Sequence, residues 1–275
     1  MKSEYINSSF NIENKVAVIT GGSGILGGEI AKGLLNAGGK IVILGTNDTK
    51  LQNKLKYLGD ENNVLALKCN VLNESDLKIT KEKILNKFDK IDILINAAGG
   101  NSPGATVRLD QTIFDIDIDQ FKKVNELNFI GTVLPTLYFG EPMAKQKHGS
   151  IINISSVSAT IPVSRVAGYS AAKAAVENFT KWLAVEMAQK FGEGIRVNAI
   201  TPGFFLTEQN KELLTNEDGS LTDRGTNIIQ MTPFKRFGKP EELIGTVLFL
   251  SSDASKFITG AVIPVDGGFT ANSGI

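Results

Sequence analysis

The chain has 275 residues, of which 42% are hydrophobic and 21% charged, and its 29 basic and 29 acidic residues give a formal net charge of zero. This composition is typical of a soluble globular protein with a sizeable core. The balanced charge gives no reason to expect nucleic acid or an anionic membrane as a partner. The chain begins M-K-S-E-Y-I-N-S-S-F and has no apolar stretch of the roughly 18 residues that a membrane span needs. We therefore expect a cytoplasmic protein without a secretory signal.

The chain has a single cysteine, Cys69, and a single histidine, His148. One cysteine cannot form an intrachain disulfide, and a zinc site made of thiolates and imidazoles needs more ligands than these two residues supply. His148 lies in the polar stretch K-Q-K-H-G with no nucleophile-elbow motif near it, so we expect a loop residue and not the base of a serine hydrolase triad. We expect Cys69 to be a strand residue, and we expect no metal site.

A glycine-rich stretch near the N-terminus lies between two predicted strands. Residues 1–14 lack periodicity and predict an arm that packs loosely or contacts another subunit. Residues 15–20 read K-V-A-V-I-T, a buried-strand pattern that is followed by G-G-S-G-I-L-G-G, an apolar helix pattern and a second strand at 40–44. In such a βαβ unit the glycines let the backbone approach a pyrophosphate, and the helix N-terminus supplies amide donors. The stretch therefore predicts dinucleotide binding.

The residues after the second strand bear on the choice between NAD and NADP. An acid there would bind the ribose 2′-hydroxyl, and an arginine would suit a 2′-phosphate. The chain has Gly45, Thr46, Asn47 and Asp48, with no acid at the expected position and no adjacent base. The absence of a cation slightly favours NAD.

The remaining segments continue the alternation of strands and helices. Residues 204–238 hold many polar groups and a D-G-S turn, so we predict a substrate-covering insertion and not a separate domain. Further strands are predicted at 64–69, 91–95, 151–154, 194–200 and 261–268, and helices at 74–88 and 240–250. Seven strands alternating with helices predict an α/β protein with one domain, a Rossmann-type, doubly wound, parallel sheet flanked by helices.

Four acids within 115–126 have the spacing of positions one, three, five and twelve of a calcium loop. Gln120, however, stands where such a loop needs its turn glycine. We therefore predict a helix with Asp119 as its N-cap, and no calcium site.

The stretch from Ile151 to Met187 carries the candidate chemistry. A short β-branched run ends at Ser155 and Ser156, which predicts a buried strand that delivers hydroxyl groups at its carboxyl end. Tyr169 and Lys173 follow one turn apart on one face of a predicted helix. A phenol with a pKa near 10 needs its anion stabilised to work near neutral pH, and we expect the lysine ammonium to lower the pKa of Tyr169. The Ser156 hydroxyl could bind the same substrate oxygen.

These motifs resemble those of the short-chain dehydrogenase/reductase family: N-I-S-S, then Y-S-A-A-K, with N-A-A-G-G and the glycine-rich loop earlier in the chain. The resemblance implies that Tyr169 is the catalytic acid and base, that Lys173 tunes it and binds the cofactor ribose, and that Ser156 anchors the substrate oxygen. Asn128 matches the helix asparagine that holds a water in a proton relay. One position departs from the family pattern, because Ile25 stands where T-G-x-x-x-G-x-G requires a glycine.

The resemblance also implies a nicotinamide cofactor, NAD or NADP, a small-molecule substrate and a homotetramer. The cofactor-binding residues that it implies are Gly21, Ser23, Gly24, Ile25, Leu26, Gly27, Thr46, Asn70, Val71, Asn96, Ala97, Gly99, Tyr169, Lys173, Pro202, Gly203 and Thr207.

The segments A-A-G-G-N-S-P-G-A-T and V-I-P-V-D-G-G-F-T-A-N-S-G resemble the subgroup described as D-mannonate oxidoreductases or fructuronate reductases. Arg165 could clamp a carboxylate in the bidentate manner that arginine favours, or it could be a surface or subunit-contact cation. Glu208, Gln209 and Asn210 could meet hydroxyl groups. The residues that we assign to the substrate site are Ser156, Ser158, Arg165, Asn101 and Phe204. Alternative functions are a gluconate 5-dehydrogenase, a 3-oxoacyl carrier-protein reductase, and a catalytically silent protein that senses NAD(P).

Overall fold

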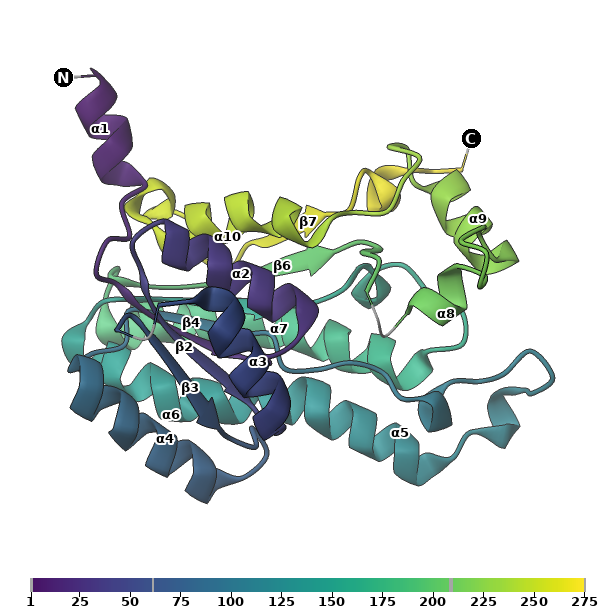
Figure 1. Cartoon of the computed structure of the whole chain (residues 1–275), viewed down its shortest axis with the longest axis horizontal. Coiled ribbons are helices and arrows are strands. Elements are labelled where there is room, and N and C mark those ends of the chain that lie inside the picture. Colours follow the sequence, from purple (N-terminus) through teal and green to yellow (C-terminus); the bar gives the residue numbers. More distant parts are fainter. Residues whose placement is uncertain (1, 61, 208–209, 275) are drawn as a thin grey trace.

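The chain folds around one seven-stranded sheet (Figure 1). The computed structural model describes residues 2–60, 62–207 and 210–274. Neighbouring strands pair in parallel, in the order β3-β2-β1-β4-β5-β6-β7. The strands are β1 (Val16–Thr20), β2 (Lys40–Gly45), β3 (Val64–Lys68), β4 (Ile93–Asn96), β5 (Gly149–Ile154), β6 (Ile195–Pro202) and β7 (Val262–Val265). The predicted single-domain, Rossmann-type α/β fold with seven parallel strands is confirmed.

Alternation along the strands divides the core into two layers. In β1, Ala17 and Ile19 pack into one buried cluster, whereas Val16 and Val18 pack into the other, because successive side chains point to opposite faces of a sheet. The first cluster includes side chains from α2 (Ile25–Asn36), α3 (Asp48–Leu58) and α10 (Ile244–Ser251). The second includes side chains from α4 (Glu74–Phe88), α6 (Gly131–Gln146) and α7 (Ala167–Phe191). Both faces are covered, as a parallel sheet requires.

The N-terminal segment is more regular than predicted. Where we expected an arm without periodicity, α1 (Lys2–Ser9) forms a short helix that projects from the body in Figure 1. Its Ile6 side chain is exposed, so this residue gives no signal of a buried helix face. Within the described residues, no helix has both the length and the apolar character needed to cross a membrane.

The acid-rich segment forms two capped helix starts. Asp115 shares a capping box with Thr112 at η2 (Ile113–Asp115), and Asp117 caps α5 (Ile118–Asn125) by accepting hydrogen bonds from two backbone N–H groups. The prediction that Asp119 is the N-cap was therefore wrong by two residues, because neighbouring aspartates have equal intrinsic preference for that position. Across the described ranges, no group of three or more His, Cys, Asp or Glu side chains is arranged to hold a metal ion.

Two single-residue predictions fall at element boundaries. His148 lies in the loop between α6 and β5, as predicted. Cys69 is buried but lies one residue beyond the end of β3, so it is not a strand residue.

The strand order places the candidate site at one edge of the sheet. β1 pairs with both β2 and β4, and open α/β sheets bind ligands beside the carboxyl ends of strands at such a reversal. The segments that follow β1, β4, β5 and β6 all start from this edge because the strands are parallel. They carry η1 (Pro103–Ala105), η4 (Val157–Ala159), α8 (Lys211–Leu214) and α9 (Asp223–Met231). The chain closes with η5 (Pro240–Leu243), α10, η6 (Asp253–Ser255), β7 and η7 (Phe269–Ala271).

Candidate active site

The end of β5 and the first turns of α7 bring Ser156, Tyr169 and Lys173 together. Ser156 caps η4 directly after β5, and Tyr169 lies in the first turn of α7. Lys173 lies one turn later, with Nζ 5.6 Å from the centre of the Tyr169 ring. The buried Nζ donates a hydrogen bond of 2.7 Å to the carbonyl oxygen of Ile154, the last residue of β5. This bond ties the catalytic helix to the strand that presents Ser156.

Burial sets the protonation of both groups. Burial raises the pKa of Tyr169, and the interaction with the Ser156 side chain lowers it by less. Burial also lowers the pKa of Lys173 from its ordinary value of 10.5 to about 8. The expectation that Lys173 lowers the pKa of Tyr169 is not met in this arrangement, because desolvation dominates at the phenol and the ammonium is bound to the Ile154 carbonyl.

Asn128 fixes the loop after β4 beside Lys173. It is fully buried in the π-helical turn η3 (Glu126–Ile130), a type of irregularity that is frequent at functional sites. Its Oδ1 accepts a bond from the N–H of Gly100 (3.0 Å), and its Nδ2 donates to the Gly100 and Val124 carbonyls (2.7 and 2.8 Å). A β-carbon at Gly99 would lie 2.5 Å from this Oδ1 and 3.4 Å from Nζ of Lys173. Only glycine fits between these two side chains.

The loop after β1 has the shape that a pyrophosphate needs. The N–H of Gly24 donates to the carbonyl of Gly21 (2.9 Å), and α2 then begins without a side chain capping its first amides. A β-carbon at Gly27 would lie 2.5 Å from the Gly21 carbonyl oxygen, so the helix can approach the turn only with glycine at this position. Free amides and a positive helix end suit an anion, so these residues fit a dinucleotide despite Ile25. Ser23, Ile25 and Leu26 belong to the same turn and helix start.

The loop after β4 supports the same interpretation. Ala97 donates its N–H to Oγ1 of Thr20, which joins the ends of β4 and β1. Asn96 donates through Nδ2 to Thr136 and Asn153, while its buried Oδ1 has no hydrogen-bond partner in the described part of the chain.

The outer residues of the predicted cofactor site lie after β2 and β3. Thr46 follows β2 directly, and Asn47 caps α3. Asp48 and Lys68 form an ion pair of 2.7 Å in which both side chains are well exposed. After β3, the backbone N–H of Asn70 donates to Asp76, and Val71 is buried.

The predicted nicotinamide loop starts at the end of β6. Pro202 is the last residue of β6, and Gly203 donates its N–H to the Val265 carbonyl of β7 (3.0 Å). The N–H of Thr207 donates to Oδ1 of Asn210, whose Nδ2 donates to the Phe205 carbonyl, so the Asn210 amide is engaged in shaping this loop. Glu208 and Gln209 lie outside the described residues.

The candidate substrate residues do not form one cluster. The Ser158 hydroxyl donates to the Ser156 hydroxyl (3.0 Å), which places Ser158 beside the catalytic group. Phe204 instead packs edge-on against Phe269, with ring centres 5.1 Å apart, and lines a cavity of about 100 Å³ that Ser156, Tyr169 and Lys173 do not line. Asn101 is exposed and donates to Thr106.

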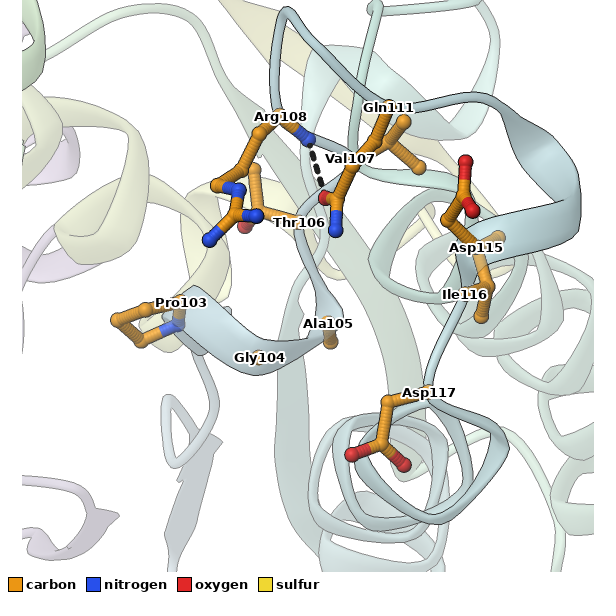
Figure 2. Close-up of a pocket in the computed structure, with 10 residues that line it drawn as sticks. All are labelled: Pro103, Gly104, Ala105, Thr106, Val107, Arg108, Gln111, Asp115, Ile116 and Asp117. Carbon is orange, nitrogen blue, oxygen red and sulfur yellow. Dashed lines mark hydrogen bonds between the residues drawn. The ribbon is translucent and has the colours of Figure 1, made fainter.

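Arg165 contacts the loop that surrounds a second cavity. Its Nε donates to the Val107 carbonyl (2.8 Å), and the Val107 N–H donates back to the Arg165 carbonyl (3.0 Å). Val107 belongs to the segment 103–117, which encloses a cavity of about 240 Å³ (Figure 2). Arg108, Asp115 and Asp117 surround this cavity, and no predicted site residue lines it.

A buried acid behind the catalytic helix was not among the residues predicted from the sequence. Glu177 lies one turn beyond Lys173 and is only 6% exposed. It accepts hydrogen bonds from the hydroxyls of Ser155 (2.8 Å) and Thr201 (3.1 Å). It therefore joins α7 to the ends of β5 and β6. Its spacing from Lys173 on the buried face of the helix was the available signal.

Comparison with known proteins places the chain in a family. A family model described as enoyl-(acyl carrier protein) reductase matches residues 22–270. The chain is 45% identical to the "Uncharacterized oxidoreductase UxuB" of Bacillus subtilis (strain 168), over 96% of this chain and 98% of that protein.

Solved structures agree with this placement. The structure of a "putative D-Mannonate oxidoreductase" from Haemophilus influenza, with bound NAD, is 41% identical and has a TM-score of 0.88, covering 98% of this chain and 100% of that one. A gluconate 5-dehydrogenase from Burkholderia cenocepacia J2315, in complex with NADP and tartrate, is 29% identical with a TM-score of 0.84, over 97% and 99% of the two chains. The chain belongs to the short-chain dehydrogenase/reductase family and is an NAD(P)-dependent oxidoreductase.

Proposed function

We propose that this oxidoreductase interconverts the alcohol and the ketone of a sugar acid of the D-mannonate and D-fructuronate type. The observation that carries the reaction is the meeting of Ser156, Tyr169 and Lys173 at the carboxyl end of β5. The sugar acid is supported by the likeness to the structure named for D-mannonate oxidation.

In the reduction, the hydroxyls of Ser156 and Tyr169 hold the substrate carbonyl oxygen, and Tyr169 gives that oxygen its proton. The bound nicotinamide cofactor supplies the hydride. The raised pKa of Tyr169 keeps the phenol protonated at neutral pH, which suits a proton donor. Lys173 returns a proton to the phenol, and a water held at Asn128, whose side chain lies near Lys173 beside Gly99, relays the replacement proton from solvent. Oxidation reverses these steps and needs the phenolate, so it should speed up as the pH rises.

We propose NAD as the preferred cofactor. Lys68 is paired with Gly45 across the sheet, at the end of β2, and its ammonium is held by Asp48. An ammonium that is already paired with an acid is less suited to binding a 2′-phosphate than a free cation would be. The residues proposed to hold the cofactor are Gly21, Ser23, Gly24, Ile25, Leu26, Gly27, Thr46, Asn70, Val71, Asn96, Ala97, Gly99, Tyr169, Lys173, Pro202, Gly203 and Thr207.

We also propose a homotetramer. Leu137 of α6 and both Trp182 and Val185 of α7 are more than half exposed, and Trp182 stacks on Phe179. Such an exposed apolar face is typical of a surface that another subunit covers. Sedimentation as a monomer at micromolar concentration would contradict this part of the proposal.

The test of the function is a substrate panel run with NAD(H) and NADP(H). It contains D-fructuronate, D-mannonate, 5-keto-D-gluconate and an acetoacetyl thioester. We expect D-fructuronate with NADH to give the highest kcat/KM. Preference for 5-keto-D-gluconate or the thioester would favour a gluconate 5-dehydrogenase or a 3-oxoacyl carrier-protein reductase. Cofactor binding without turnover of any substrate would favour a sensing protein.

A further inference from the structure

Two arginines from distant parts of the chain lie near the start of α7. Arg165 lies four residues before Tyr169, in the segment that joins η4 to α7. Arg224 belongs to the first turn of α9, in the insertion that follows β6. Nη1 of Arg224 donates to the hydroxyl of Ser164, the immediate neighbour of Arg165, at 3.3 Å. The bond brings α9 against the loop that leads into the catalytic helix.

Neither guanidinium has an acidic partner among the residues that the structure describes. Every ion pair within residues 2–60, 62–207 and 210–274 that involves an arginine uses Arg108 or Arg236. Arg165 and Arg224 are both partly buried, where an uncompensated charge is more costly than at the surface. Burial and the neighbouring charge of Arg165 both lower the pKa of Arg224. Two guanidinium groups that repel each other and lie partly out of water favour an anion that binds near both.

Both arginines also have N–H groups that are available to bind a ligand. Arg165 uses Nε on the Val107 carbonyl, and Arg224 uses Nη1 on Ser164. No hydrogen bond within the described ranges engages the two terminal nitrogens of Arg165 or the remaining nitrogens of Arg224. Arg165 has a left-handed backbone (φ 76°), and its Val107 bonds on both sides hold that conformation. The guanidinium is therefore fixed in place before a ligand arrives.

We propose that Arg165 and Arg224 together bind the carboxylate of the substrate. This rests on the proposed function and deepens it, since it assigns the acid end of the sugar acid to a two-arginine site and makes Arg224 a specificity residue. In D-fructuronate the ketone and the carboxylate stand near opposite ends of the carbon chain. A substrate whose ketone oxygen is held by Ser156 and Tyr169 can direct its carboxylate towards the segment before α7. Arg224 comes from the insertion, so an anionic substrate also draws α9 onto the site.

The experiment compares D-fructuronate with D-fructose, which carries a hydroxymethyl group in place of the carboxylate. For Arg224→Ala we expect kcat/KM for D-fructuronate to fall about 10- to 100-fold, the effect of losing one charge-assisted pair, and that for D-fructose to change by less than about threefold. Arg224→Lys keeps the charge but loses the planar two-pronged donor, and we expect an intermediate loss. Lys190→Ala removes an equal charge at an exposed position at the far end of α7, and it should alter neither value.

A binding measurement covers the case in which D-fructose is turned over too slowly. In Tyr169→Phe protein loaded with NAD, calorimetry with D-mannonate and with D-mannitol reports affinity without turnover. Arg224→Ala in this background should weaken D-mannonate binding alone. Equal losses for the acid and its neutral analogue would show that Arg224 only holds α9 in place, and would overturn the proposal. If the wild-type protein does not prefer D-fructuronate in the substrate panel, the proposed function fails. If it does and Arg224→Ala keeps that preference, only the two-arginine site is refuted.

Discussion

Replacing Lys173 by methionine should stabilise the protein near neutral pH while abolishing its activity. The side chain is only 4% exposed, and burial lowers its pKa from 10.5 to about 8. Each pKa unit corresponds to about 1.4 kcal/mol, so a folded state with the charged ammonium is less stable by about 3 kcal/mol than it would be with a neutral group. Methionine has a similar length and carries no charge. It leaves the Ile154 carbonyl without its donor, which costs about 1–2 kcal/mol.

The pH dependence of stability separates the cost of burying the ammonium from the cost of losing its hydrogen bond to Ile154. Below pH 8 the ammonium is charged in both states, and the penalty of burying it is fully present. Between about pH 8 and 10.5 the folded state has lost the proton and the unfolded state still holds it, so wild-type stability gains with rising pH at this residue. The variant has no such group.

The difference in unfolding free energy between the variant and the wild type should therefore fall by about 2–3 kcal/mol from pH 7 to pH 10, or roughly 5–10 °C in the difference between their Tm values. Thermal melts of both proteins over this range measure it. A difference that stays constant with pH would refute the conclusion that Lys173 is buried at a cost. Lys190→Met, at an exposed site, is the matched control and should show no pH-dependent difference from the wild type.

Three other substitutions test parts of the site. Tyr169→Phe removes the proton donor, so turnover should fall at least about 100-fold while fluorescence titration shows NADH binding within about threefold of the wild type; unchanged turnover would exclude Tyr169 as the acid. Gly99→Ala places a carbon 2.5 Å from Oδ1 of Asn128, so we expect loss of about 1–3 kcal/mol in urea unfolding together with reduced turnover, and a fully active, stable variant would contradict the tight contact. Glu177→Leu leaves the hydroxyls of Ser155 and Thr201 without their acceptor and should cost about 2–4 kcal/mol in the same assay, whereas Glu177→Gln keeps an acceptor oxygen and should cost less; equal losses would argue against the hydrogen bonds.

The sequence was sufficient for the architecture because the signals behind it are local. β-branched runs, glycine-rich turns and apolar helix stripes are each read within about ten residues, and their order implies a parallel sheet. α1 was not predicted because residues 1–14 show no periodic apolar pattern, and the cap of α5 was misplaced among neighbouring aspartates. The error at α5 arose because several neighbouring aspartates satisfy the same preference for the N-cap position.

The sequence predicted which residues form the candidate catalytic site, but it could not predict how burial shifts their pKa values. The spacing of Tyr169 and Lys173 places them on one helix face, and the structure brings both beside Ser156. Spacing carries no information about burial, so it could not show that desolvation raises the pKa of the phenol and lowers that of the amine. Arg224 lies 59 residues after Arg165 in the chain, and only the fold places α9 against Ser164. Contacts of this kind have no local signature.

The distribution of charge in the folded chain links these observations. The sequence is neutral overall, and several acids and bases pair at the surface, as Asp48 does with Lys68. The cations around the start of α7 are different: Lys173, Arg165 and Arg224 are buried or partly buried, and none forms an ion pair within the described residues. The nearby acid Glu177 is engaged with two hydroxyls. Keeping positive charge unpaired at this place lowers the stability of the fold, and a negatively charged substrate recovers that cost on binding. We expect the thermal stabilisation by D-mannonate to exceed that by D-mannitol for the same reason.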